Sequence, residues 1–138
     1  MREALAASSA LLVGMALLML GAGLQATLLG VRATLEGFAT FVTGAVMAGY
    51  YVGYLGGSLA APGLVRRVGH IRAFAAFTAT AAAAILVQSV FVNAAAWALL
   101  RGISGVCFAG IYVVAESWLN DRADRRSRGA LLAIYMVV

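Results

Sequence analysis

Charged residues are scarce in this chain, and lysine is absent altogether. Only 11% of the 138 residues are charged, 64% are hydrophobic, and the mean hydropathy is +0.98. A soluble domain carries roughly 25% charged residues. The shortage therefore excludes an ordinary soluble domain and predicts a protein that is surrounded by lipid.

Cysteine and proline each occur once. A single cysteine excludes a disulfide within the chain, and Cys107, in the middle of an apolar run, is interpreted as a packing residue. The sequence also lacks a metal-ligand cluster, a nucleophile–base pair and a phosphate-binding loop. We therefore expect neither an enzyme nor a cofactor nor a metal site.

Four apolar runs are long enough to cross a hydrocarbon core of about 30 Å, which needs about 20 helical residues. They do not alternate apolar and polar residues as barrel strands do, so we predict helices. The first run resembles a signal peptide at Leu24-Gln25-Ala26, but its length and the runs that follow favour a membrane span. The predicted spans, of an all-α multi-pass membrane protein, cover residues 9–31, 38–61, 73–92 and 95–119.

The arginines predict the orientation of these spans. Positively charged loops stay on the cytoplasmic side, so a cytoplasmic N-terminus is expected, in the cytoplasmic (inner) membrane. Only Arg32, near Glu36, is left outside. The net charge of +5 therefore reflects topology and not nucleic-acid binding. The eight arginines expected inside are Arg2, Arg66, Arg67, Arg72, Arg122, Arg125, Arg126 and Arg128.

A fifth apolar run starts at residue 130 and stops at 138. As a helix it spans only about 13 Å, too short to cross a bilayer. The pattern is typical of the front of a longer protein that is cut inside its fifth span, with further C-terminal helices as its partners. A re-entrant or interfacial end is the alternative.

The second predicted span carries small residues at every fourth position. Such a stripe lets two helix backbones approach closely in lipid. It predicts either static packing or a surface on which one helix moves against another. The third span lacks charge and is expected to face lipid. The stripe consists of Ala45, Gly49, Gly53, Gly57 and Ala61, flanked by Tyr50, Tyr51 and Tyr54.

The fourth span carries a polar stripe about 120° wide at about 100° per residue. It contains Arg101, Ser104, Tyr112 and Glu116. Such a stripe faces the interior of a bundle or a wet cavity. Arg101 lies about 9 Å from the centre of the span, and about 22 Å separate it from Glu116, so the two cannot pair.

Arg101 therefore needs another partner: a backbone carbonyl, Gln25 of the first span, a helix beyond this chain, or an anionic ligand. We take Arg101, Gln25, Ser104 and Tyr112 as candidate substrate or coupling residues; a buried clamp between helices is the alternative. Glu116 is expected to pair with loop arginines or to carry a proton. His70 is expected to be solvated.

Two motifs carry a family resemblance. The first lies between predicted spans two and three, where Arg67, Gly69 and Arg72 follow Pro62 and Arg66. With these residues the chain is similar to the N-terminal part of major facilitator superfamily transporters, whose loop between spans two and three reads G-x-x-x-D-[RK]-x-G-x-[RK]-[RK]. Pro62 replaces the first glycine of that motif and Arg66 replaces its acid.

The second motif, R-x-x-x-G-x-x-x-[GA], is met in span four by Arg101, Gly105 and Ala109. The segments 116–120 and 128–129 resemble a poorly characterised bacterial branch of the family.

The resemblance implies a twelve-helix fold with a small-molecule site at midplane between two halves. Spans one and four would line the cavity, span two would rock, and span three would face lipid. The loop motif would latch the halves through Arg67, Gly69 and Arg72, with Glu116 replacing the missing acid. Alternating access, proton coupling and efflux are the corresponding expectations.

Two other classes stay open at this stage. A four-helix scaffold, an accessory subunit or a truncated product could use the small-residue stripe to bind a partner, although such a protein gains nothing obvious from a buried arginine. A small multidrug exporter of four-helix subunits resembles this chain in size. Such exporters depend on an acid in the first span, where this chain has none.

Overall fold

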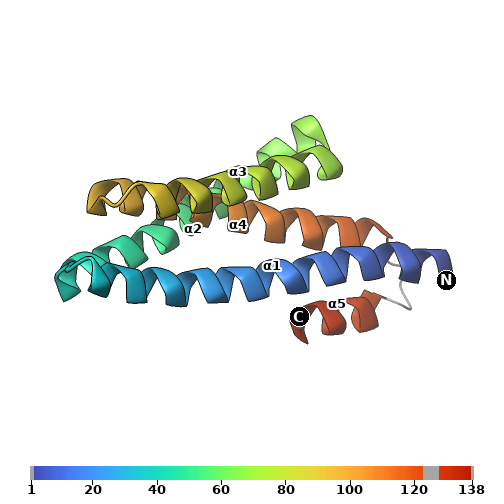
Figure 1. The fold of residues 1–138 in the computed structure, drawn as a ribbon. Helices are drawn as coiled ribbons and strands as arrows, with labels where there is room; N and C mark the ends of the chain where they lie inside the picture. The colour runs from blue at the N-terminus through green and yellow to red at the C-terminus, as the bar shows by residue number, and fades with distance from the viewer. Residues whose placement is uncertain (1, 123–127, 138) are drawn as a thin grey trace. The chain divides into compact units, whose positions relative to one another are not determined.

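The computed structural model describes residues 2–122 and 128–137, and within them the chain is helical without strands (Figure 1). The all-α prediction is therefore confirmed. The helices are α1 (Arg2–Leu35), α2 (Thr40–Val68), α3 (His70–Val90), α4 (Ala94–Arg122) and α5 (Arg128–Val137).

Among the described residues, three helices are long and apolar enough to cross a membrane: Ser9–Leu35 within α1, His70–Val90, and Ala94–Asp121 within α4. They correspond to the first, third and fourth predicted spans. With 29 residues α2 is long enough, but its glycines and tyrosines lower its hydropathy. The span predicted at 38–61 stays a prediction, supported by its length and by its place between two candidate spans.

Two compact units make up the chain. One contains residues 26–114, with the end of α1, all of α2 and α3, and most of α4. The other contains the start of α1, the end of α4, and α5. The polar stripe of α4 is divided between them, because Arg101, Ser104 and Tyr112 belong to the first unit and Glu116 to the second.

The connection between α2 and α3 is much shorter than the sequence suggested. The second span was expected to end at residue 61, with a basic loop up to residue 72. Instead α2 continues through Pro62 to Val68, and α3 starts at His70. Gly69 alone separates the helices, at φ +85° and ψ 162°, a conformation essentially restricted to glycine.

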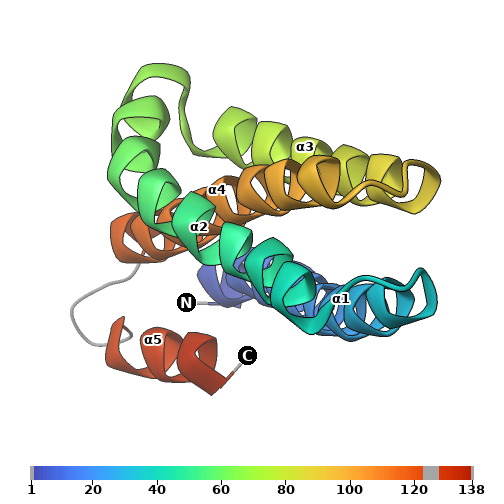
Figure 2. The ribbon, with the colours of Figure 1, turned by 90° about the vertical axis from the view of Figure 1, so that its left-hand side faces the viewer.

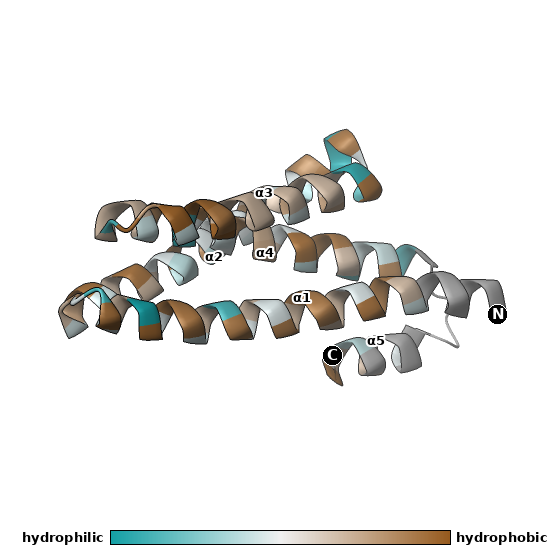
Figure 3. Cartoon of the chain, in the orientation of Figure 1, coloured by the Kyte–Doolittle hydropathy of each residue, from teal (hydrophilic) through white to brown (hydrophobic). Residues whose placement is uncertain are grey.

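The loop prediction was wrong because proline removes only one backbone donor, and helices in lipid tolerate this loss. The exposed arginines of this turn therefore project from helix ends, Arg66 and Arg67 from the last turn of α2 and Arg72 from the first turn of α3. Figure 3 shows hydrophilic residues at this turn, next to a mostly hydrophobic α3.

The glycines of α2 pack directly against the backbone of α4. A methyl group at Gly49 would lie 2.8 Å from the Ala98 carbonyl oxygen, and one at Gly53 would overlap the backbone of Gly102. At Gly57 it would lie 2.6 Å from the Cα of Val106. Both helices advance by four residues from one contact to the next, so they run parallel. We call this contact the glycine seam (Figure 2).

Both helices contribute small residues to the glycine seam. A methyl group at Gly105 of α4 would overlap the Tyr50 carbonyl group and lie 2.7 Å from the Tyr54 amide nitrogen. Ala109 contributes its own methyl group against Gly57. Each helix therefore offers small residues where the other presents backbone, which allows the close approach that drives association in lipid.

An aromatic cluster closes the end of this unit where α1 turns into α2. Trp97 is fully buried against Leu29, Ala33 and Val46. Its ring centroid lies 5.3 Å from that of Phe38, and its indole N–H donates to the Phe91 carbonyl at 2.6 Å. The same tryptophan thus fixes the α1–α2 turn and the α3–α4 turn.

Helix α3 lies beside α4 in both views (Figures 1 and 2). A methyl group at Gly110 of α4 would overlap the ring of Phe77, and Gln88 donates a hydrogen bond to the Trp97 carbonyl at 3.3 Å. The rest of α3 is largely exposed, including Ile71 and Leu86. One buried stripe and a wide apolar exposed face are what a helix at the lipid boundary requires.

Replacing Gly53 by alanine should destabilise the protein, whereas Gly56→Ala should not. A methyl group at Gly53 overlaps the Gly102 backbone, but one at Gly56 meets nothing within 4 Å. Overpacking costs typically about 1–3 kcal/mol, and alanine otherwise favours a helix. Thermal unfolding of the detergent-purified protein measures the difference. Equal melting temperatures for the two variants would show that the glycine seam is not close-packed.

Candidate functional site

Arg101 is buried about two turns into α4, with 6% of its surface exposed. Its guanidinium carbon lies 4.7 Å from the centroid of the Tyr50 ring. This is a cation–π contact, which contributes about 2 kcal/mol when it is desolvated. The partners expected for Arg101 were a carbonyl group, Gln25, a further helix or an anion, and an aromatic face was not among them.

The glycine seam explains why Tyr50 lies so close to Arg101. Gly105, one turn after Arg101, is pressed against the Tyr50 carbonyl group. Tyr50 is flanked along α2 by the seam residues Gly49 and Gly53. With the two backbones in contact, the tyrosine ring lies over the guanidinium group without a gap.

Aromatic rings continue from Tyr50 along both helices. The Tyr50 centroid lies 6.3 Å from that of Phe108 and 6.1 Å from that of Tyr54. The Tyr54 and Tyr112 centroids are 6.2 Å apart. These separations suit tilted or edge-to-face aromatic pairs. We call the four rings the aromatic ladder.

Ser104 lies one turn after Arg101 and is completely buried. Its hydroxyl oxygen makes no hydrogen bond within the described part of the chain. A serine in a helix usually finds a backbone carbonyl one turn back, as Thr78 does with Phe74 at 2.9 Å. An unsatisfied buried hydroxyl calls for a functional or structural reason.

Gln25 and Glu116 belong to the other compact unit, so a common site with Arg101 stays a prediction. Gln25 is half-buried. Glu116 is exposed, and its carboxylate accepts a hydrogen bond from the Tyr135 hydroxyl of α5 at 3.4 Å. The sequence analysis expected arginine partners for Glu116. The side chains of Arg122, Arg125, Arg126 and Arg128 lie outside the described residues.

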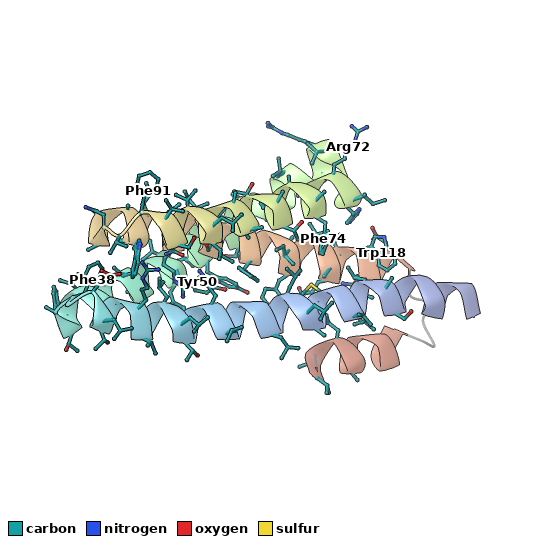
Figure 4. All side chains as sticks on the ribbon, viewed as in Figure 1. Phe38, Tyr50, Arg72, Phe74, Phe91 and Trp118 are labelled. Carbon is teal, nitrogen blue, oxygen red and sulfur yellow. The ribbon has the colours of Figure 1, made fainter. Side chains whose placement is uncertain are left out.

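The latch candidates at the α2–α3 turn are accessible. Arg67 and Arg72 are exposed, as is Arg66 in the place of the family's acid. In Figure 4 the Arg72 side chain points away from the helices. Gly69 provides the sharp turn that places all three at one end of the unit.

Several residues of this unit were missed by the sequence analysis. Gln88 is a single amide inside an apolar span, and such a residue signals an internal hydrogen bond. Asn93 was read only as the end of a run, but its side-chain oxygen accepts from the Ala96 amide at 3.1 Å and caps α4. Arg32, which the sequence placed near Glu36, pairs with it at 3.0 Å; its bond to the Ser89 carbonyl at 3.4 Å was not predicted.

Within the part of the chain that the structure describes, no group of histidine, cysteine or acidic residues could hold a metal ion. Cys107 is buried in α4. What these residues can offer a ligand is a buried cation, a buried hydroxyl and a series of aromatic rings.

Comparison with known proteins finds relatives that share one kind of name. An uncharacterised MFS-type transporter of Enterobacter sp. (strain 638) is 35% identical over 128 residues, which is 93% of this chain and 34% of the relative. The uncharacterised MFS-type transporters named YcaD from Escherichia fergusonii and Escherichia coli are 34% and 33% identical over the same shares. No family model and no solved structure matches the chain.

The helices and their hydropathy define a multi-pass helical membrane protein. The relatives make the chain a homologue of major facilitator superfamily (MFS) transporters, which confirms the resemblance drawn from the two motifs. The chain spans about a third of the length of the curated relatives it matches.

Tyr50→Leu should lower stability by about 2 kcal/mol, because it removes the aromatic face under a buried cation. Tyr50→Phe keeps the ring and should stay near wild type. Phe41→Leu, at a position that is 86% exposed, is the matched control on the same helix. Thermal unfolding in detergent compares the three. If Tyr50→Leu unfolds at the temperature of Phe41→Leu, the cation–π contact contributes nothing.

Proposed function

We propose that this chain is part of a secondary active transporter that moves a small solute across the cytoplasmic membrane by alternating access. The observation that carries the proposal is the buried Arg101, held against Tyr50 within a candidate span. A cation inside the membrane is costly and is usually retained for a substrate or ion pathway. The names of the relatives support the same class.

The glycine seam argues against the scaffold alternative. That alternative needed the small-residue stripe of α2 to bind a partner protein. The stripe is already covered, because Gly49, Gly53 and Gly57 pack on the α4 backbone of the same chain. Efflux, proton coupling and the expected inner-membrane location are parts of the proposal that rest on the family resemblance and on the arginine distribution.

Arg101→Gln should abolish gradient-driven transport without reducing the amount of protein in the membrane. The control is Arg32→Gln, which removes an arginine whose side chain is 45% exposed and should keep most of the activity. Ethidium, benzoate and a neutral sugar, tested in proteoliposomes that carry a pH gradient, provide cationic, anionic and uncharged probes. A wild-type rate in Arg101→Gln, for a probe that the wild type carries, would refute the assigned role.

The orientation part of the proposal places the α2–α3 turn in the cytoplasm and the α1–α2 turn outside. In a Cys107→Ser background, a membrane-impermeant maleimide should label Glu36→Cys in intact cells. It should label Ile71→Cys, at a position that is 81% exposed, only after permeabilisation. The reverse pattern would place the N-terminus outside.

The latch part of the proposal gives the basic turn a conformational role. Arg67→Ala and Glu116→Gln should each lower the transport rate by about tenfold, which corresponds to 1.4 kcal/mol, because each removes a charge that stabilises one state of the cycle. His70→Ala, at the same turn, serves as the control. Wild-type turnover in both charge variants would eliminate the latch.

A further inference from the structure

The aromatic ladder and Arg101 form one continuous surface. The guanidinium group lies over Tyr50, and the rings of Phe108, Tyr54 and Tyr112 follow at centroid separations of 6.1 to 6.3 Å. Tyr50, Tyr54 and Tyr112 are half-buried and so keep part of their rings accessible. The buried guanidinium group of Arg101 thus lies at one end of a row of partly accessible tyrosine rings.

The orientation of Arg101 suits a carboxylate. One face of the guanidinium group is covered by the Tyr50 ring, whereas its N–H donors lie in the plane of the group and point outward from its edge. That edge matches the two oxygens of a carboxylate. Since only 6% of the Arg101 surface is exposed, the attraction between its charge and a carboxylate is screened less than in water.

Ser104 supplies a second donor next to the first. Residues three apart on a helix are neighbours, about 5–6 Å between Cβ atoms. The Ser104 hydroxyl is fully buried and makes no hydrogen bond within the described residues. A ligand oxygen held at Arg101 gives this hydroxyl the acceptor that the chain around it does not provide.

The charges of this unit favour an anion over a cation. Between residues 26 and 114 the sequence contains a single acid, Glu36. It pairs with Arg32 at 3.0 Å at the end of α1. The tyrosine faces alone would attract organic cations, but the adjacent guanidinium group repels them.

Resting on the proposed transport function, we infer that the substrate of this site is an aromatic carboxylate. Its carboxylate binds the edge of Arg101 with Ser104 as second donor, and its ring stacks on Tyr54 and Tyr112. An inorganic anion would use the same donors, but it would gain nothing from the rings. The dependence on the rings therefore separates the two ligand classes.

The test measures binding by the full-length protein, purified in detergent, as a rise in unfolding temperature. Benzoate should bind at least about tenfold more tightly than cyclohexanecarboxylate, which has the same charge and similar size but no aromatic face. Benzylamine, the cationic analogue, should not stabilise it. Equal affinity for benzoate, cyclohexanecarboxylate and chloride would overturn the ring assignment and leave a simple anion site.

Single substitutions test which side chains bind the benzoate. Arg101→Lys keeps the charge but loses the planar fork, and it should weaken benzoate binding by about tenfold. Ser104→Ala should weaken it by a smaller factor. Tyr54→Leu should remove the preference for benzoate over cyclohexanecarboxylate, whereas Tyr54→Phe, which retains the ring, should keep it. Phe41→Leu, at a position of α2 that is 86% exposed, lies outside the ladder and should bind as wild type does. Unchanged benzoate binding in both Arg101→Lys and Tyr54→Leu would overturn the inference.

The failure of this inference and the failure of the proposed function give different results. If proteoliposomes transport ethidium but the protein does not bind benzoate, the protein is a transporter and the substrate class is wrong. If benzoate binds as described but no gradient drives any flux of it, the site stands as a binding site and the transport proposal fails.

Discussion

Direct contact between the backbones of α2 and α4 is the constraint on which the rest of the described unit depends. Gly49, Gly53 and Gly57 allow it from one side and Gly105 from the other. In lipid no hydrophobic force pulls helices together, so small residues that bring backbones close provide the van der Waals contact instead. Three successive contacts in register make α2 and α4 a tightly fitted parallel pair, which favours static packing over sliding.

The pairing of α2 with α4 also lowers the free-energy cost of a charge inside the membrane. An isolated arginine at this depth is costly. The seam brings Tyr50 over the guanidinium group, so an aromatic face contributes to stabilising the cation. A cation–π contact does not neutralise the positive charge, and a site for an anionic ligand requires that charge.

Polar contacts at the two ends of the unit differ in kind. At the end of α1 they are internal: Arg32 pairs with Glu36, Asn93 caps α4, and the indole of Trp97 binds the Phe91 carbonyl. At the α2–α3 turn the arginines are exposed. Paired polar groups connect neighbouring segments at one end, whereas the exposed arginines at the other can contact a further surface, as the latch proposal requires.

Composition and periodicity by themselves determined that this is a helical membrane protein with close-packed small residues in α2 and a polar stripe in α4, because run length, hydropathy and four-residue spacing act locally along one helix. Residues 62–68 could not be assigned correctly, since proline and arginine favour a helix end only on average. Only the tertiary structure decided that the stripe meets α4, that Tyr50 covers Arg101, and that the Ser104 hydroxyl is buried without a partner in the described chain. These facts depend on which faces of two helices, about fifty residues apart in sequence, come together, and no local pattern encodes that distance or rotation.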